Sequence, residues 1–290
     1  MCAGGAPRCK ILTYNTAHLS RFLWSDFKSF LAGPALQYDA VMIQETHWGK
    51  SARFSVAGWT AITSNGRDKA DGVAVFVHPK YARESIRFSE VVEGRVLRVQ
   101  VALTASGLEV ICVYQHVWSG KGSVDTCRDK RRSVLRKLGT AVRQVPARDT
   151  LVVGGDFNSG ILKSPGLVGP AVLPLGGWGD RLTSARDLTS FAEEHGLVAL
   201  NARSGNSPAT FLHKKGHSQI DVLFARQGSG DGVARRCAPQ DVPVGGCRDM
   251  DHRALDASVR AKTLGSPKPH VHWLVFWWFV SCPHMCVQSC

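Results

Sequence analysis

The chain has 290 residues, of which 44% are hydrophobic, so its composition matches a globular protein with a substantial core and excludes a disordered chain. Its formal net charge is +13, and only Lys262 and Lys268 of its 36 basic residues, and none of its 23 acidic residues, lie beyond position 260. The first 260 residues therefore carry +11. A basic body favours a polyanionic partner, nucleic acid first and an anionic membrane second, with simple solubility as the alternative.

The cysteines and the chain ends bear on the cellular compartment. Nine cysteines, an odd and scattered set, indicate a reduced protein rather than a disulfide-linked one. Residues 1–10 lack the apolar stretch of a signal peptide. The longest apolar run, at 273–280, is too short to span a bilayer. We therefore expect an intracellular protein, nuclear or cytoplasmic, with no membrane span.

Short apolar runs, each bounded by glycine, proline or polar residues, predict strands. In chain order these runs are 10–15, 39–45, 72–78, 95–103, 108–114, 150–156 and 219–225. The runs at 39–45 and 150–156 do not alternate and are expected to be buried on both faces, whereas the run at 95–103 alternates and is expected to have one wet face.

Helical spacing of apolar residues predicts helices at 20–32, at 125–145 with Asp125 as its N-cap, and at 183–197 with Gly196 near its end. The Gly/Pro-rich segment 160–181 predicts a long loop. Many strands with a few helices outside them favour an α/β sandwich of packed sheets covered by helices.

Regular patterning stops near Arg260, which predicts three parts of unequal size. Residues 1–8 form a short extension, residues 9–260 form one domain, and residues 261–290 form an appendage without a clear domain.

Polar residues stand at or just beyond the ends of several predicted strands. They are Asn15, Glu45, Asp156, Asn158, Asp221 and the pair Asp251–His252 before a final apolar segment. Strand ends of one sheet converge, and loops there commonly build sites. Converging carboxylates are costly unless a cation or protons neutralise them. Carboxylate and amide oxygens select Mg²⁺ or Mn²⁺ over zinc, so a divalent-cation site is expected here.

Each of these residues also has a simpler explanation when it is taken alone. Glu45 could cap a turn, Asp156 and Asn158 could form an Asx-turn, Asp221 could be a satisfied buried acid, and His252 could lie on the surface. Their joint occurrence at strand ends favours a common site.

The order of these motifs resembles one known family. Asn15, Gln44–Glu45, Val113–Tyr114, Gly155–Asn158 (GDFN), Ile220–Asp221 and Asp251–His252 follow one another as in the endonuclease/exonuclease/phosphatase family, which includes DNase I, exonuclease III-type apurinic endonucleases and non-LTR retrotransposon endonuclease domains. The resemblance covers roughly residues 9–260. It implies a DNase I-like fold, a four-layered α/β sandwich in which two packed, mostly antiparallel or mixed sheets are flanked by helices.

The resemblance also implies a phosphodiester hydrolase that depends on Mg²⁺ or Mn²⁺. Glu45 is the expected principal metal ligand, with Asn15 and Asp251 beside it. The cation would act as a Lewis acid on the phosphate and steady the leaving oxygen.

Roles for the remaining residues follow from the same resemblance. Asp156 is expected to position and activate water, Asn158 and His252 to hydrogen-bond the phosphoryl oxygens, and Tyr114 to contact the phosphate. Asp221 is expected to orient His252 and hold it cationic. The proton acceptor is left open between Asp156 and the His252–Asp221 pair.

Some positions depart from the family pattern. They are Ala17, Gln115–His116, Thr210–Phe211 and Met250. Ala17 puts a contact near the metal in doubt, because many relatives have a second amide or acid there. None of the departures removes an expected catalytic residue.

DNA is the expected partner and substrate, because the body is basic and the segment around Arg128, Arg131 and Arg132 offers phosphate contacts, with a solvated helix face as the alternative. The motifs resemble retrotransposon endonucleases most, which implies internal DNA cleavage and a reverse transcriptase encoded downstream in an intact element. The alternatives are a phosphatase or phosphodiesterase acting on inositol phosphates or lipid headgroups, and a catalytically dead nucleic-acid-binding remnant.

Overall fold

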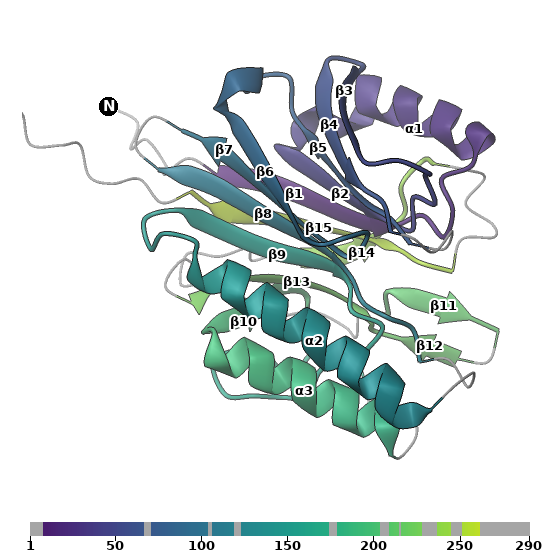
Figure 1. Ribbon diagram of the computed structural model, residues 1–290, viewed down its shortest axis with the longest axis vertical. Coiled ribbons are helices and arrows are strands. Elements are labelled where there is room, and N and C mark those ends of the chain that lie inside the picture. The colour runs from purple at the N-terminus through teal and green to yellow at the C-terminus, as the bar shows by residue number, and fades with distance from the viewer. Residues whose placement is uncertain are drawn as a thin grey trace, which may run out of the picture.

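Two β-sheets pack face to face in the computed structural model, and helices cover their outer faces, which gives four layers (Figure 1). The structure describes residues 8–66, 71–103, 106–118, 123–173, 179–203, 209–214, 216–227, 237–244 and 251–261. This arrangement confirms the α/β sandwich of packed, mixed sheets that was predicted from the sequence.

The first sheet has seven strands and the second has six. In spatial order the first contains β14 (Cys237–Gln240), β15 (Ala254–Arg260), β1 (Arg8–Asn15), β2 (Ala40–Gln44), β5 (Val73–Val77), β4 (Trp59–Ser64) and β3 (Ala52–Val56). The second contains β10 (Leu197–Ala199), β13 (Asp221–Arg226), β9 (Thr150–Asp156), β8 (Gly107–Tyr114), β7 (Val96–Ala102) and β6 (Ile86–Val92). A separate hairpin consists of β11 (Phe211–His213) and β12 (Gly216–Ser218).

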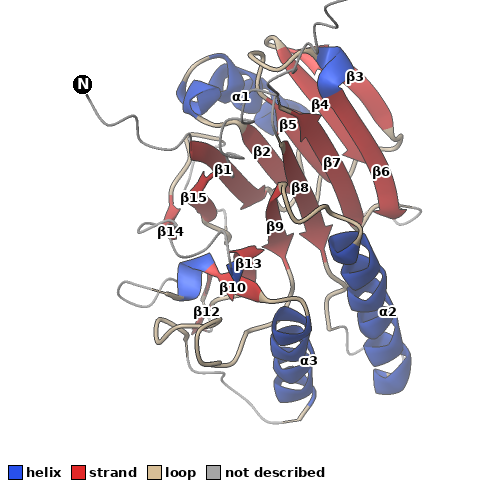
Figure 2. Ribbon diagram, turned by 90° about the vertical axis from the view of Figure 1, so that its left-hand side faces the viewer, coloured by secondary structure: helices blue, strands red, loops and turns tan. Residues whose placement is uncertain are grey.

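The helices lie on opposite sides of the paired sheets. Helix α1 (Arg21–Ala32) covers the first sheet, whereas α2 (Val124–Arg143) and α3 (Asp180–Glu194) cover the second (Figures 1 and 2). Helix α1 buries Phe27 and Leu31 in a core cluster that includes Phe76 of β5. Short 3₁₀ turns occur at η1 (Pro34–Gln37), η2 (Arg83–Ser85) and η3 (Leu200–Ala202).

Strand pairing gathers the predicted site residues at one end of the sandwich. In the first sheet, parallel pairing sets Asn15 of β1 beside Gln44 of β2, directly before Glu45. In the second sheet, Asp156 at the end of β9 is paired with Tyr114 at the end of β8 and with Asp221 at the start of β13. The register of both sheets therefore brings distant segments of the chain together.

Gly154 and Gly155 allow β9 to pack closely between its neighbours. A Cβ at Gly155 would overlap the carbonyl oxygen of Val113, and the φ of 144° is rarely adopted by residues with side chains. A Cβ at Gly154 would overlap the side chain of Leu223 and come within 2.8 Å of Met42 Cε in the opposite sheet. The two glycines therefore allow Asp156 to lie where the two sheets meet.

The seven predicted strands and three predicted helices are confirmed, with small shifts at their ends. The expectation that Asp125 caps α2 was wrong, because the N-cap is Ser123, whose hydroxyl accepts a hydrogen bond from the Asp125 amide at 3.2 Å. The run at 95–103 was expected to have one face in water. In β7 most of that face is half-buried instead, because Arg98 pairs with Glu109 of β8 at 2.9 Å. Residues 1–7 and 262–290 lie outside the described residues, so the predicted domain boundaries remain a prediction.

Among the helices of the described ranges, none is both long and apolar enough to cross a membrane. The cysteines at positions 9, 112, 127 and 237, which lie in those ranges, are unpaired thiols.

Candidate active site

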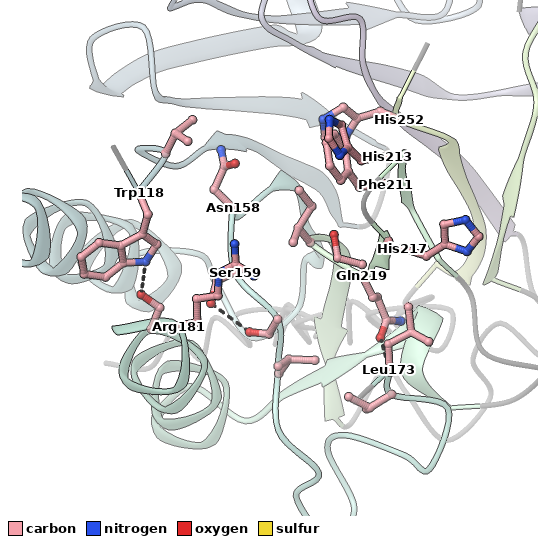
Figure 3. Close-up of a pocket in the computed structure, with 18 of the residues that line it drawn as sticks. Trp118, Asn158, Ser159, Leu173, Arg181, Phe211, His213, His217, Gln219 and His252 are labelled. Carbon is pink, nitrogen blue, oxygen red and sulfur yellow. Dashed lines mark hydrogen bonds between the residues drawn. The ribbon is translucent and has the colours of Figure 1, made fainter. Parts of the chain in front are cut away.

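A cleft of about 680 Å³ opens at the end of the sandwich where the predicted site residues meet. Glu45, Asn158 and His252 are among the residues that line it. Figure 3 shows Phe211, His213 and His252 along one wall, with Trp118 and Arg181 on the opposite side. A cleft of this size admits more than a phosphate group, because drug-sized ligands occupy sites of similar volume.

His252 and Asp221 form a buried hydrogen-bonded pair. His252 Nδ1 lies 3.1 Å from Asp221 Oδ2, and the two residues are 8% and 2% exposed. Burial opposes protonation of the imidazole, but the charge and hydrogen bond of Asp221, with the nearby Asp156 and Glu45, outweigh it and raise the pKa of His252 to about 9. His252 is therefore an imidazolium at neutral pH.

Two buried polar residues hold Asp221 in place, and the sequence did not predict either of them. Thr210 Oγ1 accepts hydrogen bonds from the amides of Ile220 and Asp221, each at 3.1 Å. Asn201 Nδ2 donates to the carbonyl oxygen of Asp221 at 3.0 Å, and its Oδ1 accepts from the Leu223 amide at 3.2 Å. These bonds fix the start of β13 and hence the direction of the Asp221 carboxylate.

The Asp156 carboxylate lies at the centre of the site and is 1% exposed. Its Oδ1 accepts from the Asn158 amide at 2.7 Å, and its Oδ2 accepts from Asn15 Nδ2 at 2.9 Å. Burial, followed by repulsion from Asp221, raises the pKa of Asp156 to about 7, even though His252, Asn158 and Asn15 favour the ionised form. This carboxylate therefore changes its protonation state near neutral pH.

Asn15 links the two sheets at the site. Its Nδ2 donates to Glu45 Oε1 as well as to Asp156 Oδ2, both at 2.9 Å, while its Oδ1 accepts from the Ala17 amide at 2.8 Å. The side chain thus holds two carboxylates at a fixed separation. This orienting contact was not among the roles expected of Asn15, and direct ligation of a metal by Asn15 stays a prediction.

Tyr114 lies beside Glu45 and above a buried ion pair. The guanidinium of Arg95 lies 4.6 Å from the Tyr114 ring centroid and pairs with Asp71. Burial and the negative charge of Glu45 raise the pKa of Tyr114, so its hydroxyl keeps its proton. Arg95 and Asp71 were not identified from the sequence.

Asn158 forms a turn with Asp156, as the simpler explanation of these two residues anticipated. Its backbone N–H donates a hydrogen bond to the Asp156 carboxylate, its side-chain Nδ2 donates to Gln115 O at 2.9 Å, and its φ is 46°. The side chain nevertheless lies at the cleft (Figure 3). The Asx-turn and a place in the site are therefore compatible.

Arg131 does not take the exposed position that we expected of a DNA phosphate contact. It is 5% exposed, and its guanidinium donates to the carbonyl oxygens of His116, Phe157 at 3.0 Å and Asn158 at 3.2 Å. These hydrogen bonds hold the turn that contains Asn158 in place. The structure corrects the sequence prediction here, because a guanidinium occupied by buried carbonyls is not presented to a substrate.

The other predicted phosphate contacts lie at the surface of α2. Arg128 pairs with Asp125 at 3.0 Å and with Asp180 at 3.2 Å, and Arg132 pairs with Asp187 at 2.9 Å. Substrate binding by these two residues stays a prediction.

Asp251 is exposed, and its backbone carbonyl accepts from the Leu212 amide at 2.6 Å, which pins the β11–β12 hairpin next to His252.

The donor groups of the site suit a hard divalent cation on the Glu45 side. Within the described residues, Asp156, Asp221 and His252 each offer a ligand atom within 4.8 Å of the others. His252 Nδ1 and Asp221 Oδ2 are already joined by a 3.1 Å hydrogen bond, and ligation of a cation by Glu45 stays a prediction. Burial, followed by repulsion from Asp221, raises the pKa of Asp156, so a cation near this carboxylate would stabilise its ionised form. Oxygen donors with uncompensated charge fit Mg²⁺ or Mn²⁺.

The sequence carries a family signature that agrees with this geometry. Residues 12–241 match the model of the Endonuclease/Exonuclease/phosphatase family, which is well over half of the chain. The protein therefore belongs to the endonuclease/exonuclease/phosphatase family, a family of nucleases and phosphatases. Among curated protein sequences there is no significant match.

Solved structures share the fold at low sequence identity. The AP endonuclease LMAP from Leishmania major is 14% identical, with 87% of this chain and 88% of that chain covered and a TM-score of 0.63. The endonuclease domain of TRAS1, a telomere-specific non-LTR retrotransposon, is 16% identical, with 89% and 100% covered and a TM-score of 0.59. The 3′ phosphatase NExo from Neisseria, bound to a product DNA hairpin, is 16% identical, with 86% and 98% covered and a TM-score of 0.60. These likenesses establish the DNase I-like fold.

Proposed function

We propose that this protein is a divalent-metal-dependent DNA endonuclease of the retrotransposon type. The observation that carries the proposal is the convergence of Asp156, the His252–Asp221 pair and Glu45 beside one cleft, which Glu45 and His252 line. This set provides a carboxylate for water, a cationic donor for phosphate and a carboxylate for a cation.

Glu45, with Asn15 and Asp251 beside it, would hold Mg²⁺ or Mn²⁺, which supplies Lewis-acid stabilisation of the phosphate when bound. Asn15 keeps the Glu45 and Asp156 carboxylates at a fixed spacing. Tyr114, which keeps its proton, hydrogen-bonds the Glu45 carboxylate and would contact the phosphate from there.

Asp156 is the better candidate for the proton acceptor. His252 Nε2 lies 3.9 Å from Asp156 Oδ2, which is too long for a direct hydrogen bond but leaves room for an oxygen atom about 2.8 Å from each. Because the pKa of His252 is raised to about 9, its Nε2 carries a proton and donates at neutral pH. Asp156, with a pKa of about 7, is matched to accept a proton from water. Asp221 orients the His252 ring and balances its charge.

DNA is favoured as the substrate by the charge of the body and by the structural neighbours. The first 260 residues carry +11, and a duplex presents dense negative charge to such a surface. Among the structural neighbours described above, one is the endonuclease domain of a retrotransposon, one is an AP endonuclease and one is a 3′ phosphatase bound to a DNA hairpin. The motif pattern favours the retrotransposon type, with a reverse transcriptase as its partner in an intact element.

The same fold leaves one further enzyme class as an alternative. The family also contains phosphatases, so a phosphatase acting on inositol phosphates or lipid headgroups would use the same groups. Such an enzyme would show no dependence on polymer length.

Nicking of supercoiled plasmid tests the proposal. We expect nicked circles with Mg²⁺, none with EDTA, and none with Asp156→Asn in either condition. Asp26→Asn, which removes one exposed carboxylate from α1, is the matched control and is expected to nick like the wild type. Plasmid binding without nicking, in Mg²⁺ and Mn²⁺ alike, would overturn the proposal in favour of a non-catalytic DNA-binding protein.

A further inference from the structure

Two histidines next to the site face each other outside the machinery described above. His18 follows β1 and His47 follows β2, and their Nδ1 atoms lie 2.8 Å apart, with ring centroids separated by 4.9 Å. His18 is exposed and His47 is partly exposed, so the pair is open to solvent.

The backbone holds both rings in place. The His47 amide donates to Asp71 O at 3.2 Å, and the carbonyl oxygen of His18 accepts from the Ser20 amide at 2.9 Å. Ala17 and His47 have φ values of 52° and 54°, a conformation that non-glycine residues seldom adopt and that clusters at functional sites. The fold of two adjacent loops therefore sets where the two side chains begin, and the contact between the two Nδ1 atoms orients the rings.

We propose that His18 and His47 bind a divalent transition-metal ion at a site separate from the Glu45 cation. Imidazole nitrogens are ligands for Ni²⁺, Cu²⁺, Co²⁺ and Zn²⁺ rather than for Mg²⁺. With the two Nδ1 atoms 2.8 Å apart and an ion about 2.1 Å from each, the N–metal–N angle would be about 85°. This angle is close to the right angle of octahedral or square-planar ions and below the tetrahedral angle that Zn²⁺ prefers. The geometry therefore points to Ni²⁺ and its neighbours in preference to Zn²⁺, with water completing the coordination.

The far side of the His47 ring strengthens this assignment. His47 Nε2 lies 3.6 Å from Glu45 Oε2. A histidine that ligates a metal donates its other ring N–H to a carboxylate, a backbone carbonyl or water, which fixes the tautomer and the ring orientation. The Glu45 carboxylate is near enough to take this place after a small shift of either side chain. In the metal-free pair one ring donates its Nδ1–H to the other. Binding of the ion moves that proton to Nε2 of the same ring, so both rings ligate as neutral imidazoles through Nδ1.

The same contact couples the new site to the proposed catalytic cation, and this part rests on the proposed function. An ion on the histidine pair adds positive charge next to Glu45 and strengthens the hold of His47 on its carboxylate. We therefore expect Ni²⁺ to raise the Mg²⁺ concentration needed for half-maximal hydrolysis severalfold in the wild type and to have no such effect in His18→Ala.

Calorimetric titration of the full chain with Ni²⁺ alone tests the site without reference to activity. His18→Ala and His47→Ala are each expected to bind one equivalent less than the wild type, or to bind it at least tenfold more weakly. His217→Ala, which removes an exposed histidine from β12, is the control and is expected to keep the full stoichiometry. Thermal unfolding checks that each variant is folded.

Ring NMR signals of histidine provide a second readout. Paramagnetic Ni²⁺ is expected to broaden the His18 and His47 ring signals at concentrations that leave His252 unchanged. Equal Ni²⁺ binding by the wild type and both variants would overturn the proposal and leave the pair as a hydrogen bond only. Ni²⁺ binding by Asp156→Asn separates the two proposals, because this variant is expected to lose hydrolysis and keep the ion.

Discussion

The imidazole of His252 and the carboxylate of Asp221 are joined by a 3.1 Å contact although they are 31 residues apart and both nearly buried. Neither group is stable as a buried charge alone, because the protein would have to desolvate it without compensation. We expect the two residues to act as a unit. Asp221→Asn and His252→Gln should each reduce the hydrolysis rate nearly as much as the double variant does. Strictly additive losses in the double-mutant cycle would refute the pairing.

The pKa of His252 should depend on Asp221. NMR titration of the metal-free protein in EDTA is expected to give a pKa of about 9 in the wild type and a much lower value in Asp221→Asn, where burial remains but the main opposing charge is gone.

The sign of the resulting stability effect follows from the direction of the shift. The folded pKa of His252 lies above its ordinary value of 6.5, so the contribution to the free energy of unfolding is fully present below pH 6.5 and is lost as the pH rises through about 9. Metal-free Asp221→Asn should lack this alkaline loss. A wild-type ring that titrates near its ordinary value would contradict the account.

Glu45→Gln keeps the size of the side chain and removes the charge that we assign to the cation. Hydrolysis at low Mg²⁺ is expected to fall by orders of magnitude and to recover in part at high Mn²⁺, because Mn²⁺ binds a given site more tightly than hard Mg²⁺ does. Measurement of rate against metal concentration separates a binding defect from a loss of fold. Rates like those of the wild type at low Mg²⁺ would rule out this role for Glu45.

Arg131 and its neighbour Arg132 offer a matched pair of substitutions on α2. Arg131→Met is expected to lower the free energy of unfolding by about 3 kcal/mol and to reduce activity, because it removes a buried donor group and leaves carbonyl oxygens under the Asn158 turn unbonded. Arg132→Met should change the free energy of unfolding by less than about 1 kcal/mol, because its ion pair with Asp187 is half exposed. Urea unfolding measures both, and equal effects would show that Arg131 is not a bracing residue.

The sequence predicted most of the strands that form the centre of each sheet. It missed those at the margins, and also β4 and β15, each of which lies one strand in from an edge of the first sheet. Central strands such as β2 and β9 are continuous apolar runs, buried along their whole length. Strands β3 and β6 were missed because they expose much of their length, and β11 and β12 because each has only three residues. Strand β14 was missed because it contains Pro239, and proline is atypical of strand interiors. The strand lies at the edge of its sheet, where proline is tolerated.

The site residues with charge could be predicted, whereas the residues that hold them could not. An acid at the end of an apolar run is visible in sequence, as at Asp156 and Glu45. Thr210 and Asn201 act through backbone contacts made only after folding, so no local pattern marks them. Arg131 had an available signal, because it shares a helical face with Val134 and Leu138, which are buried.

A side-by-side comparison of substrates tests the central proposal most directly. Supercoiled plasmid, a short duplex with one abasic site, inositol polyphosphate and sphingomyelin are offered with Mg²⁺ at matched phosphate concentration. We predict that nicked circles accumulate before any mononucleotide is released, and that plasmid affinity falls by about 0.9 log units per phosphate contact for each tenfold rise in salt. Phosphate release from the small substrates with the plasmid untouched would contradict the account and identify a phosphatase.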